Sequence, residues 1–214
     1  SETTNLPLLK YIASKGKPLL VSTGMCDLAD IHEAMEVIRS EDNNEIVLLQ
    51  CTSLYPTEPK HVHLKALGLL REAFQSPVGF SDHTLHFATP AAAVALGACV
   101  VEKHFTSNRQ LDGPDHAYAL EPEDLKLMVS IIRSTEQALG HAMKILLPEE
   151  AEVARRESVR AAKDIQAGEI LTSDLVNVKR PVLGGIPPRY ISAVLGNQVK
   201  SPLKEGDPIT WQDI

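Results

Sequence analysis

Short apolar runs alternate with longer amphipathic stretches through the first two thirds of the chain. The apolar runs are rich in Val, Leu and Ile, which is typical of strands buried on both faces of a parallel sheet. They span residues 18–24, 45–53, 76–83 and 98–105. The amphipathic stretches repeat apolar residues every three or four positions, and this spacing predicts helices. They span residues 28–40, 63–74, 89–97 and 121–140. This order predicts four βα units, a parallel sheet and right-handed crossovers.

Polar side chains follow each apolar run, at the predicted carboxyl end of every strand. They are Ser22, Thr23, Gln50, Thr52, Ser53, Ser81, His83, Glu102 and His104. In an open doubly wound sheet the ligand contacts concentrate at one switch point. In a (β/α)₈ barrel every strand contributes to one rim. We therefore expect an α/β fold in which residues 1–145 form the last four βα units of a TIM (β/α)₈ barrel; an open four-stranded sheet is the alternative.

The pattern changes after residue 145. Residues 146–157 are rich in charge and predict a helical linker. Residues 158–214 contain an internal repeat, because Gly168 and Gly206 are each followed by Thr four positions later and then by Asp and an apolar residue. Two copies of one turn-and-strand device predict a small β-rich domain with pseudo-twofold structure. The Gly- and Pro-rich segment 179–190 is expected to form a rigid loop between the copies.

Composition narrows the classes of partner. The chain has 214 residues, 43% of them hydrophobic, and a formal net charge of -7. This charge argues against nucleic acid or an anionic membrane as the main partner. The three cysteines, Cys26, Cys51 and Cys99, form no CxxC motif and predict free thiols in a reducing cytoplasm. The chain opens without Met on a stretch that resembles a loop entering a helix, so we expect it to begin inside a larger protein.

His83 and His104 are the strongest candidates for chemistry. Each directly follows an apolar run, and the two runs are consecutive. Neighbouring strands lie ~4.8 Å apart, so residues at the same level can reach one ion. Two imidazoles without a thiolate suit Mn²⁺, Mg²⁺ or Co²⁺ completed by water and substrate oxygens, better than a closed structural zinc site. Asp82 points the opposite way along its strand and is expected to have a supporting role.

Two loops offer further candidates. Ser53 and Tyr55, in CTSLYPT, could hydrogen-bond a polyhydroxylated ligand; the alternative is a loop in which Tyr55 packs on Pro56. Asp115 follows the Gly113-Pro114 turn. The turn could direct the Asp115 side chain into the site; the alternative is that Asp115 only caps the turn.

Taken together, these stretches resemble the sialic acid synthase family, which includes the legionaminic and pseudaminic acid synthases. The matching motifs are STGM, CTSLYPT, GFSDHT, VEKHFT, DGPDHAYALEP and IQAGEILTSDLVNVKRPVLGGI. The resemblance implies a (β/α)₈ barrel followed by an antifreeze-like (SAF) domain, here residues 158–214. It also implies condensation of phosphoenolpyruvate with an N-acylated amino sugar, such as N-acetylmannosamine, to a nine-carbon 2-keto acid and phosphate.

The resemblance assigns roles to single residues. It implies that His83 and His104 bind the divalent metal and that Glu2 lies at the rim, where we expect it to transfer protons. The residues that it implies line the sugar and phosphoenolpyruvate sites are Ser22, Ser53, Tyr55, Ser81, Asp115 and Glu2. It implies that Arg180 reaches the sugar from the antifreeze-like domain of the other chain in a domain-swapped homodimer. In the family most phosphate-binding residues belong to the first half of the barrel. The alternative is a non-catalytic remnant that acts as a sugar-binding or dimerisation module.

Overall fold

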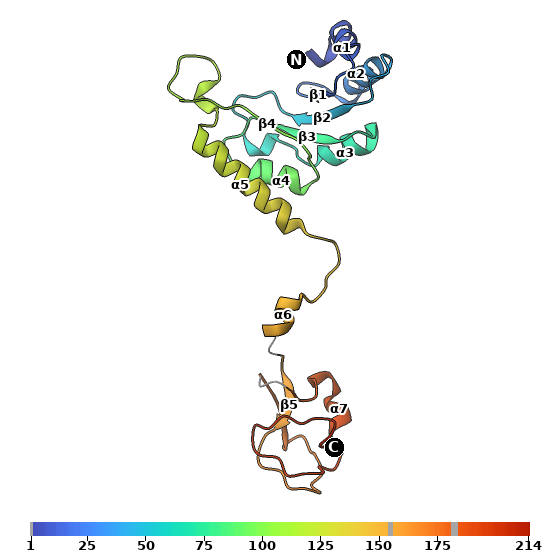
Figure 1. The fold of residues 1–214 in the computed structure, drawn as a ribbon, viewed down its shortest axis with the longest axis vertical. Helices are drawn as coiled ribbons and strands as arrows, with labels where there is room; N and C mark the ends of the chain where they lie inside the picture. The colour runs from blue at the N-terminus through green and yellow to red at the C-terminus, as the bar shows by residue number, and fades with distance from the viewer. Residues whose placement is uncertain (1, 154–155, 181–183) are drawn as a thin grey trace. The chain divides into compact units, whose positions relative to one another are not determined.

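The computed structural model describes residues 2–153, 156–180 and 184–214. The chain divides into two compact units, Ser1–Ala142 and Met143–Ile214, and both can be followed in Figure 1. The sequence placed the end of the first domain at residue 145. Each unit has its own core of buried apolar side chains, so each is described by itself.

Four parallel strands form the sheet of the first unit. They are β1 (Leu19–Ser22), β2 (Ile46–Cys51), β3 (Val78–Asp82) and β4 (Val101–Lys103). Their order in the sheet is β1-β2-β3-β4, so each strand pairs with the next one along the chain. An open doubly wound sheet reverses its strand order at the switch point, and this sheet does not. The parallel half-barrel sheet is confirmed, whereas its assignment to the last four units of a barrel stays a prediction.

Five α-helices accompany the sheet in chain order (Figure 1). They are α1 (Leu6–Ala13), α2 (Leu28–Arg39), α3 (Ala66–Phe74), α4 (Ala88–Ala95) and α5 (Pro122–Leu139). The sequence signals mark several ends: Asp27 and Asp30 form a capping box at the start of α2, and Pro122 opens α5. The helix predicted from residue 63 begins only at Ala66, because the backbone of His63 is left-handed, with φ 50°.

The two faces of the sheet differ in chemistry. Val21, Leu48 and Phe80 point to one face and are buried in the apolar core with the helices. On the opposite face the register pairs Cys51 with Ser81, and Ser81 with Glu102. Side chains alternate along a strand, so polar residues at every second position gather on this face near the strand ends. This polar face is the one that a barrel would enclose.

A buried ion pair joins the ends of β3 and β4 on the helix-covered face. Lys103 Nζ lies 2.9 Å from Asp82 Oδ2, and the two side chains are 5% and 0% exposed. Lys103 also donates to the carbonyl of Thr84, and Asp82 Oδ1 accepts from the Thr84 backbone N–H at 2.8 Å. Each charge therefore has an opposite charge and a further hydrogen bond, which a buried ion requires.

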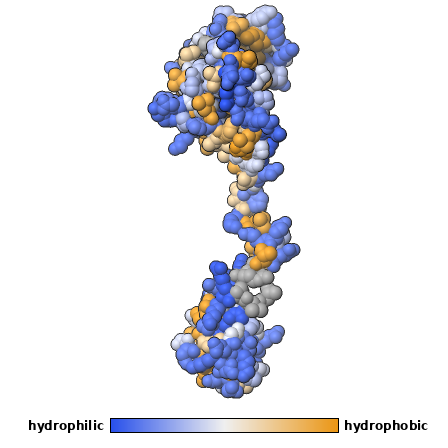
Figure 2. All heavy atoms as spheres, turned by 90° about the vertical axis from the view of Figure 1, so that its left-hand side faces the viewer, coloured by the Kyte–Doolittle hydropathy of each residue, from blue (hydrophilic) through white to orange (hydrophobic). Residues whose placement is uncertain are grey.

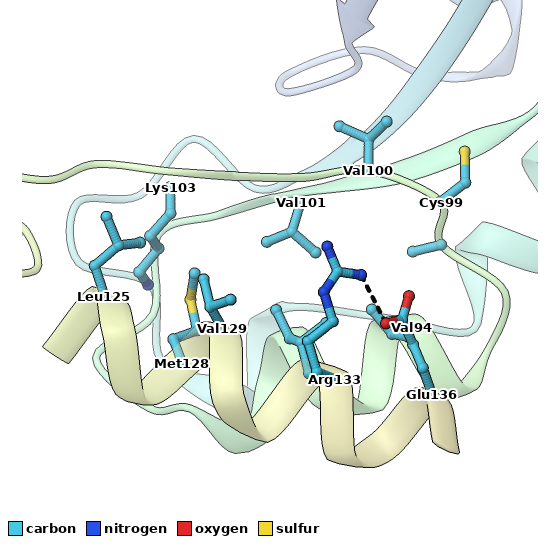
Figure 3. A pocket seen from close by; sticks show the side chains of 12 residues that line it. Val94, Cys99, Val100, Val101, Lys103, Leu125, Met128, Val129, Arg133 and Glu136 are labelled. Carbon is cyan, nitrogen blue, oxygen red and sulfur yellow. Dashed lines mark hydrogen bonds and ion pairs between the residues drawn. The ribbon is translucent and has the colours of Figure 1, made fainter. Parts of the chain in front are cut away.

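A cavity of about 300 Å³ lies on the same helix-covered side, between β4, α4 and α5. Figure 3 shows Lys103, Leu125 and Met128 at one end, with Arg133 and Glu136 ion-paired at the other. The cavity belongs to the face opposite the polar strand ends. Neither Glu102 nor His104 lines it.

The second unit is built from short elements. They are α6 (Pro148–Val153), β5 (Ser158–Ala161), β6 (Val176–Lys179) and α7 (Ile191–Val194). β5 and β6 pair antiparallel, and isolated bridges link Ile165 with Leu203 and Ile170 with Gln198. The surface of this unit in Figure 2 is mainly hydrophilic, as expected when the apolar residues form a core. Of the predicted helical linker 146–157, Pro148–Val153 is helical, and residues 154–155 lie outside the described part.

The predicted internal repeat is visible in two equivalent turns. Gly168 and Gly206 both have left-handed backbones, with φ 85° and 88°. The carboxylate that follows each glycine accepts a hydrogen bond from the backbone N–H three positions before it. Glu169 accepts from Gln166 and Asp207 accepts from Lys204, each at 2.8 Å. The repeated sequence motif therefore adopts the same turn at both places. The loop predicted at 179–190 includes residues 181–183, which lie outside the described residues.

We predict that Lys103→Met lowers the free energy of unfolding of the first unit by about 3 kcal/mol, because it leaves the buried Asp82 carboxylate without its cation. Lys60→Met is the matched control: the Lys60–Glu58 pair is on the surface, with 65% and 67% of the side chains exposed, and its loss should cost less than about 1 kcal/mol. Urea unfolding of both variants measures the difference. Equal losses in both variants would contradict the structural role of the buried pair.

Candidate metal and sugar site at the strand ends

The two candidate histidines lie together on the polar side of the sheet. His83 directly follows β3 and His104 directly follows β4. Their ring centroids are 5.3 Å apart, at an interplanar angle of 77°. His83 Nδ1 lies 2.9 Å from the carbonyl oxygen of Thr52. A carbonyl only accepts, so Nδ1 carries the hydrogen, and Nε2 keeps the lone pair with which an imidazole binds a metal.

The donor set fits a divalent ion with open coordination positions. A backbone carbonyl on the second ring nitrogen is the usual way in which a protein orients a metal-binding imidazole. Among the described residues, no group of three or more His, Cys, Asp or Glu side chains is arranged to enclose an ion. Two imidazoles would therefore leave most positions to water and substrate oxygens, as Mn²⁺, Mg²⁺ and Co²⁺ accept.

Two tyrosines form an aromatic wall beside the histidines. The Tyr55 ring centroid lies 4.2 Å from that of His83 and 5.8 Å from that of His104. The Tyr118 ring centroid lies 5.3 Å from that of His104 and 5.8 Å from that of Tyr55. Tyr55 is half-exposed on its loop, so its ring contacts the histidines and still borders solvent. A flat apolar surface beside polar groups suits a sugar ring.

A hydrogen-bonded polar layer lies under the histidines. The Ser81 hydroxyl donates to Glu102 Oε1 at 2.8 Å. The Cys51 thiol faces His83, Ser22 and Ser81, which act on its pKa. Polar residues from all four strand ends thus gather around His83.

This network shifts two pKa values. Burial raises the pKa of the Cys51 thiol, but hydrogen bonds from His83, Ser22 and Ser81 outweigh burial, and the pKa ends below its ordinary value. Burial lowers the pKa of His83, but its bonds to Cys51 and to the Thr52 carbonyl outweigh this, and the pKa ends above its ordinary value. The two shifts share one cause, the contact between the thiol and the imidazole.

Ser53 is held near the same network by a glycine. A Cβ atom on Gly24 would lie 2.3 Å from Ser53 Oγ and 3.0 Å from Cys51 Sγ. Only a glycine therefore lets the loop after β1 approach the loop after β2 so closely. Ser22, at the end of β1, is close enough to Cys51 to lower the pKa of its thiol.

The remaining predicted residues have other neighbours. Asp115 accepts a hydrogen bond from the Tyr118 hydroxyl, and its Oδ2 lies 3.6 Å from His104 Nδ1. Glu2 lies in a short 3₁₀ turn and accepts from the Asn5 side chain at 3.0 Å. None of the contacts described for Glu2 joins it to His83 or His104, and its proposed role in proton transfer stays a prediction.

Arg180 belongs to the second unit. It follows β6, its side chain is 76% exposed, and its Nε lies 4.0 Å from Glu157 Oε1. An exposed ion pair at this distance is weak, so Arg180 is free to take another anionic or polar partner at little cost.

Sequence reasoning placed Glu102 at the rim without giving it a role, and it selected neither Cys51 nor Tyr118. The period-two alternation of strands could have assigned Cys51 and Glu102 to the site: Cys51 lies two positions before Ser53, and Glu102 lies two positions before His104. Tyr118 had no such signal, because it lies in an irregular loop that returns to the strand end.

Comparison with known proteins defines the family. A model described as the NeuB family matches residues 1–144, and a model described as the SAF domain matches residues 156–214. The chain therefore belongs to the NeuB family and carries a SAF domain. The resemblance to the sialic acid synthases, read from the sequence motifs, is confirmed.

The relatives include named synthases. The chain is 39% identical, over its whole length, to the N,N'-diacetyllegionaminic acid synthase of Legionella pneumophila, of which it covers 61%. It is 42% identical, over 97% of its length, to the enzyme of the same name from Campylobacter jejuni, of which it covers 63%. The chain thus spans less than two thirds of the length of these curated relatives.

Solved structures show the same fold. All of the chain superposes on 65% of a spore coat polysaccharide biosynthesis protein from Bacillus subtilis, with a TM-score of 0.62 and 36% identity. In a second match, 71% of the chain superposes on 53% of an N-acetylneuraminic acid synthetase from Leptospira borgpetersenii, with a TM-score of 0.65 and 30% identity. Within the described residues, no helix combines the length and apolar character needed to cross a membrane.

We predict that the pH at which Cys51 is alkylated at half its maximal rate is low and depends on His83. The rate of iodoacetamide labelling of Cys51, followed by mass spectrometry of its peptide, should reach half its maximum at a pH below the ordinary thiol value. In His83→Ala the midpoint should move upward, because the thiolate loses the imidazole that stabilises it.

The midpoint is the informative quantity, because a change in access alters the maximal rate and not the midpoint. His61→Ala, an exposed histidine on the loop after β2, is the control and should leave the midpoint unchanged. An unchanged midpoint in His83→Ala would mean that the thiol–imidazole contact does not stabilise the thiolate.

Proposed function

We propose that this chain is the metal- and sugar-binding part of a sialic-acid-type synthase, which condenses phosphoenolpyruvate with an N-acylated amino sugar. The products are a nine-carbon 2-keto acid and phosphate. The observation that carries the proposal is the pair of imidazoles at adjacent strand ends, 5.3 Å apart, on the polar face of the sheet. Membership of the NeuB family supports the reaction class.

A divalent ion bound to His83 and His104 would supply Lewis-acid polarisation of the open-chain sugar aldehyde. In this reaction class C3 of phosphoenolpyruvate forms the new bond to C1 of the sugar, and the aldehyde oxygen takes up a proton. Water adds at C2 and loses its protons, and phosphate leaves as the C2–O bond breaks. The Thr52 carbonyl fixes the ring of His83 in the tautomer that leaves Nε2 available. Tyr55 excludes water from one side of the two imidazoles and offers a surface to the sugar.

Ser81 and Glu102 form the hydrogen-bonding group that faces the reacting atoms. Ser81 donates to Glu102, so one carboxylate oxygen of Glu102 stays available to accept a proton or to hold a water molecule. Ser53 and Ser22 extend the same layer toward the first strand and offer hydroxyl groups to the polar ends of the substrates. Asp115 faces the sugar hydroxyls from the other side, next to His104.

Arg180 extends the proposal to a second chain. Its guanidinium has several donors in a fixed fork, which suits sugar hydroxyls and acyl oxygens. We propose that it completes the site of a partner subunit in a domain-swapped homodimer. Its exposure and its long contact with Glu157 support a guanidinium that can take another partner at little cost.

Metal binding tests the site. Titration calorimetry of the protein with MnCl₂ should show one ion per chain, and His83→Ala and His104→Ala should each weaken the affinity by a factor of at least about 100. His61→Ala, the control, should bind as the parent does. Retention of full affinity in the His83→Ala, His104→Ala double variant would refute the two-histidine site.

Product formation tests the reaction and the dimer, in the enzyme that contains this chain. Phosphate release from phosphoenolpyruvate is measured with N-acetylmannosamine and with diacetamido sugars, each with Mn²⁺.

A His83→Ala subunit mixed with an Arg180→Ala subunit should regain activity, because mixed dimers contain one site with both defects and one with neither. Absence of recovery, after subunit exchange is demonstrated, would place Arg180 outside the partner's site.

A further inference from the structure

Among the described residues, Tyr118 makes contacts with the site that packing alone does not explain. Its hydroxyl donates to Asp115, and its ring lies beside the rings of His104 and Tyr55. Tyr118 belongs to the short 3₁₀ turn His116–Tyr118 in the loop between β4 and α5. A tyrosine that served only to cover apolar surface would have no need of a carboxylate partner.

The loop that carries Tyr118 is closed at its base. The backbone N–H of Leu120 donates to the His104 carbonyl at 3.0 Å, and that of Thr106 donates to the Leu120 carbonyl at 2.8 Å. Inside the loop a hydrogen bond of 2.7 Å joins the Thr106 hydroxyl to His116 Nδ1. These bonds tie the turn that contains Tyr118 to the residues next to His104, so its position is defined relative to the imidazole.

Asp115 alone is poorly suited to orient His104. Its side chain is 57% exposed, and its Oδ2 lies 3.6 Å from His104 Nδ1, longer than a normal hydrogen bond. An exposed pair of this kind contributes little and does not hold one geometry. The hydrogen bond from Tyr118 to the other carboxylate oxygen restricts the rotation of Asp115 and keeps Oδ2 directed at the imidazole.

At His104 a carboxylate oxygen takes the place that the Thr52 carbonyl has at His83, at 3.6 Å instead of 2.9 Å. At His83 the Nδ1–H is held by the Thr52 carbonyl, a fixed backbone group. At His104 the corresponding acceptor is a side-chain carboxylate, which can rotate unless another group holds it. In both cases the result is an imidazole with Nε2 directed away from the acceptor and available to an ion.

We propose that Tyr118 is a positioning residue that holds the Asp115 carboxylate against His104 Nδ1 and so presents His104 Nε2 to the metal. This inference rests on the metal site of the proposed function. The geometry that supports it is the bond from the Tyr118 hydroxyl to Asp115 and the contact between the Tyr118 and His104 rings.

Two measurements on Tyr118→Phe test the proposal. This variant keeps the ring and removes only the hydroxyl. The affinity for MnCl₂, measured by titration calorimetry, should fall roughly tenfold, the effect typical of a group that orients a metal ligand. In the metal-free protein, ¹⁵N NMR of the imidazoles should show that His104 loses part of its Nδ1–H tautomer, whereas His83 keeps its own.

A double-mutant cycle separates positioning from packing. Asp115→Asn should weaken Mn²⁺ binding about as much as Tyr118→Phe, and the double variant should lose little more than either single variant. Tyr11→Phe is the matched control, because Tyr11 is 62% exposed on α1 and should leave both readings unchanged. Additive losses in the double variant would mean that Tyr118 acts independently of Asp115 and would overturn the proposal.

The tautomer measurement also separates this inference from the proposed function. If the parent protein binds no Mn²⁺, the metal site is refuted, and the His104 tautomer in the metal-free variants still decides whether Tyr118 acts through Asp115. If the parent binds Mn²⁺ and Tyr118→Phe shows the parent's affinity and tautomer, the metal site stands and the role of Tyr118 is refuted.

Discussion

The geometry of the site depends on the buried ion pair between Asp82 and Lys103. The pair joins the last residues of β3 and β4 on the helix-covered face, where both side chains are almost fully buried. Because successive side chains point to opposite faces, the residues that follow, His83 and His104, fall on the polar face. A one-residue slip between β3 and β4 would separate the two charges inside the core, at a cost of several kcal/mol. The register that brings the imidazoles together is thus stabilised from the other side of the sheet.

The polar face is arranged in layers. Leu49 is fully buried beneath the polar network, and it fills the space above Gly79, where a Cβ atom would lie only 2.5 Å from the Leu49 side chain. Above this apolar layer come the thiol of Cys51 and the hydroxyl of Ser81, and then the two imidazoles. Each step toward the strand ends adds polarity, and of the two imidazoles His104 keeps more contact with solvent, with 30% of its side chain exposed, whereas His83 is 6% exposed. This gradient explains why the Cys51 thiol is subject to both burial and hydrogen bonding.

The sequence was sufficient to predict the elements that depend on local periodicity. The four strands, α2, α4 and α5 begin and end within a few residues of their predicted limits, because apolar period and capping residues determine them locally. The start of α3 was placed three residues too early, since nothing in the sequence marks His63 as left-handed. Cys51 and Glu102 were within reach of period-two reasoning, but Tyr118 was not. Its place beside His104 depends on the bonds that close the loop between Thr106 and Leu120, and these join residues with no repeating pattern.

The two units contribute unequally to the proposed chemistry. Apart from Arg180, every residue assigned to the rim belongs to the first unit, and six of them, Ser22, Cys51, Ser53, Ser81, His83 and Glu102, are connected through hydrogen bonds or close contacts. The second unit is organised around its own repeated turns, in which glycine geometry and a carboxylate cap recur without reference to the first unit. The residues of the proposed metal site consequently all belong to the first unit. The proposed role of Arg180 requires a second surface. An exposed arginine with a weak local partner can provide that surface to another chain without disturbing the fold that carries it.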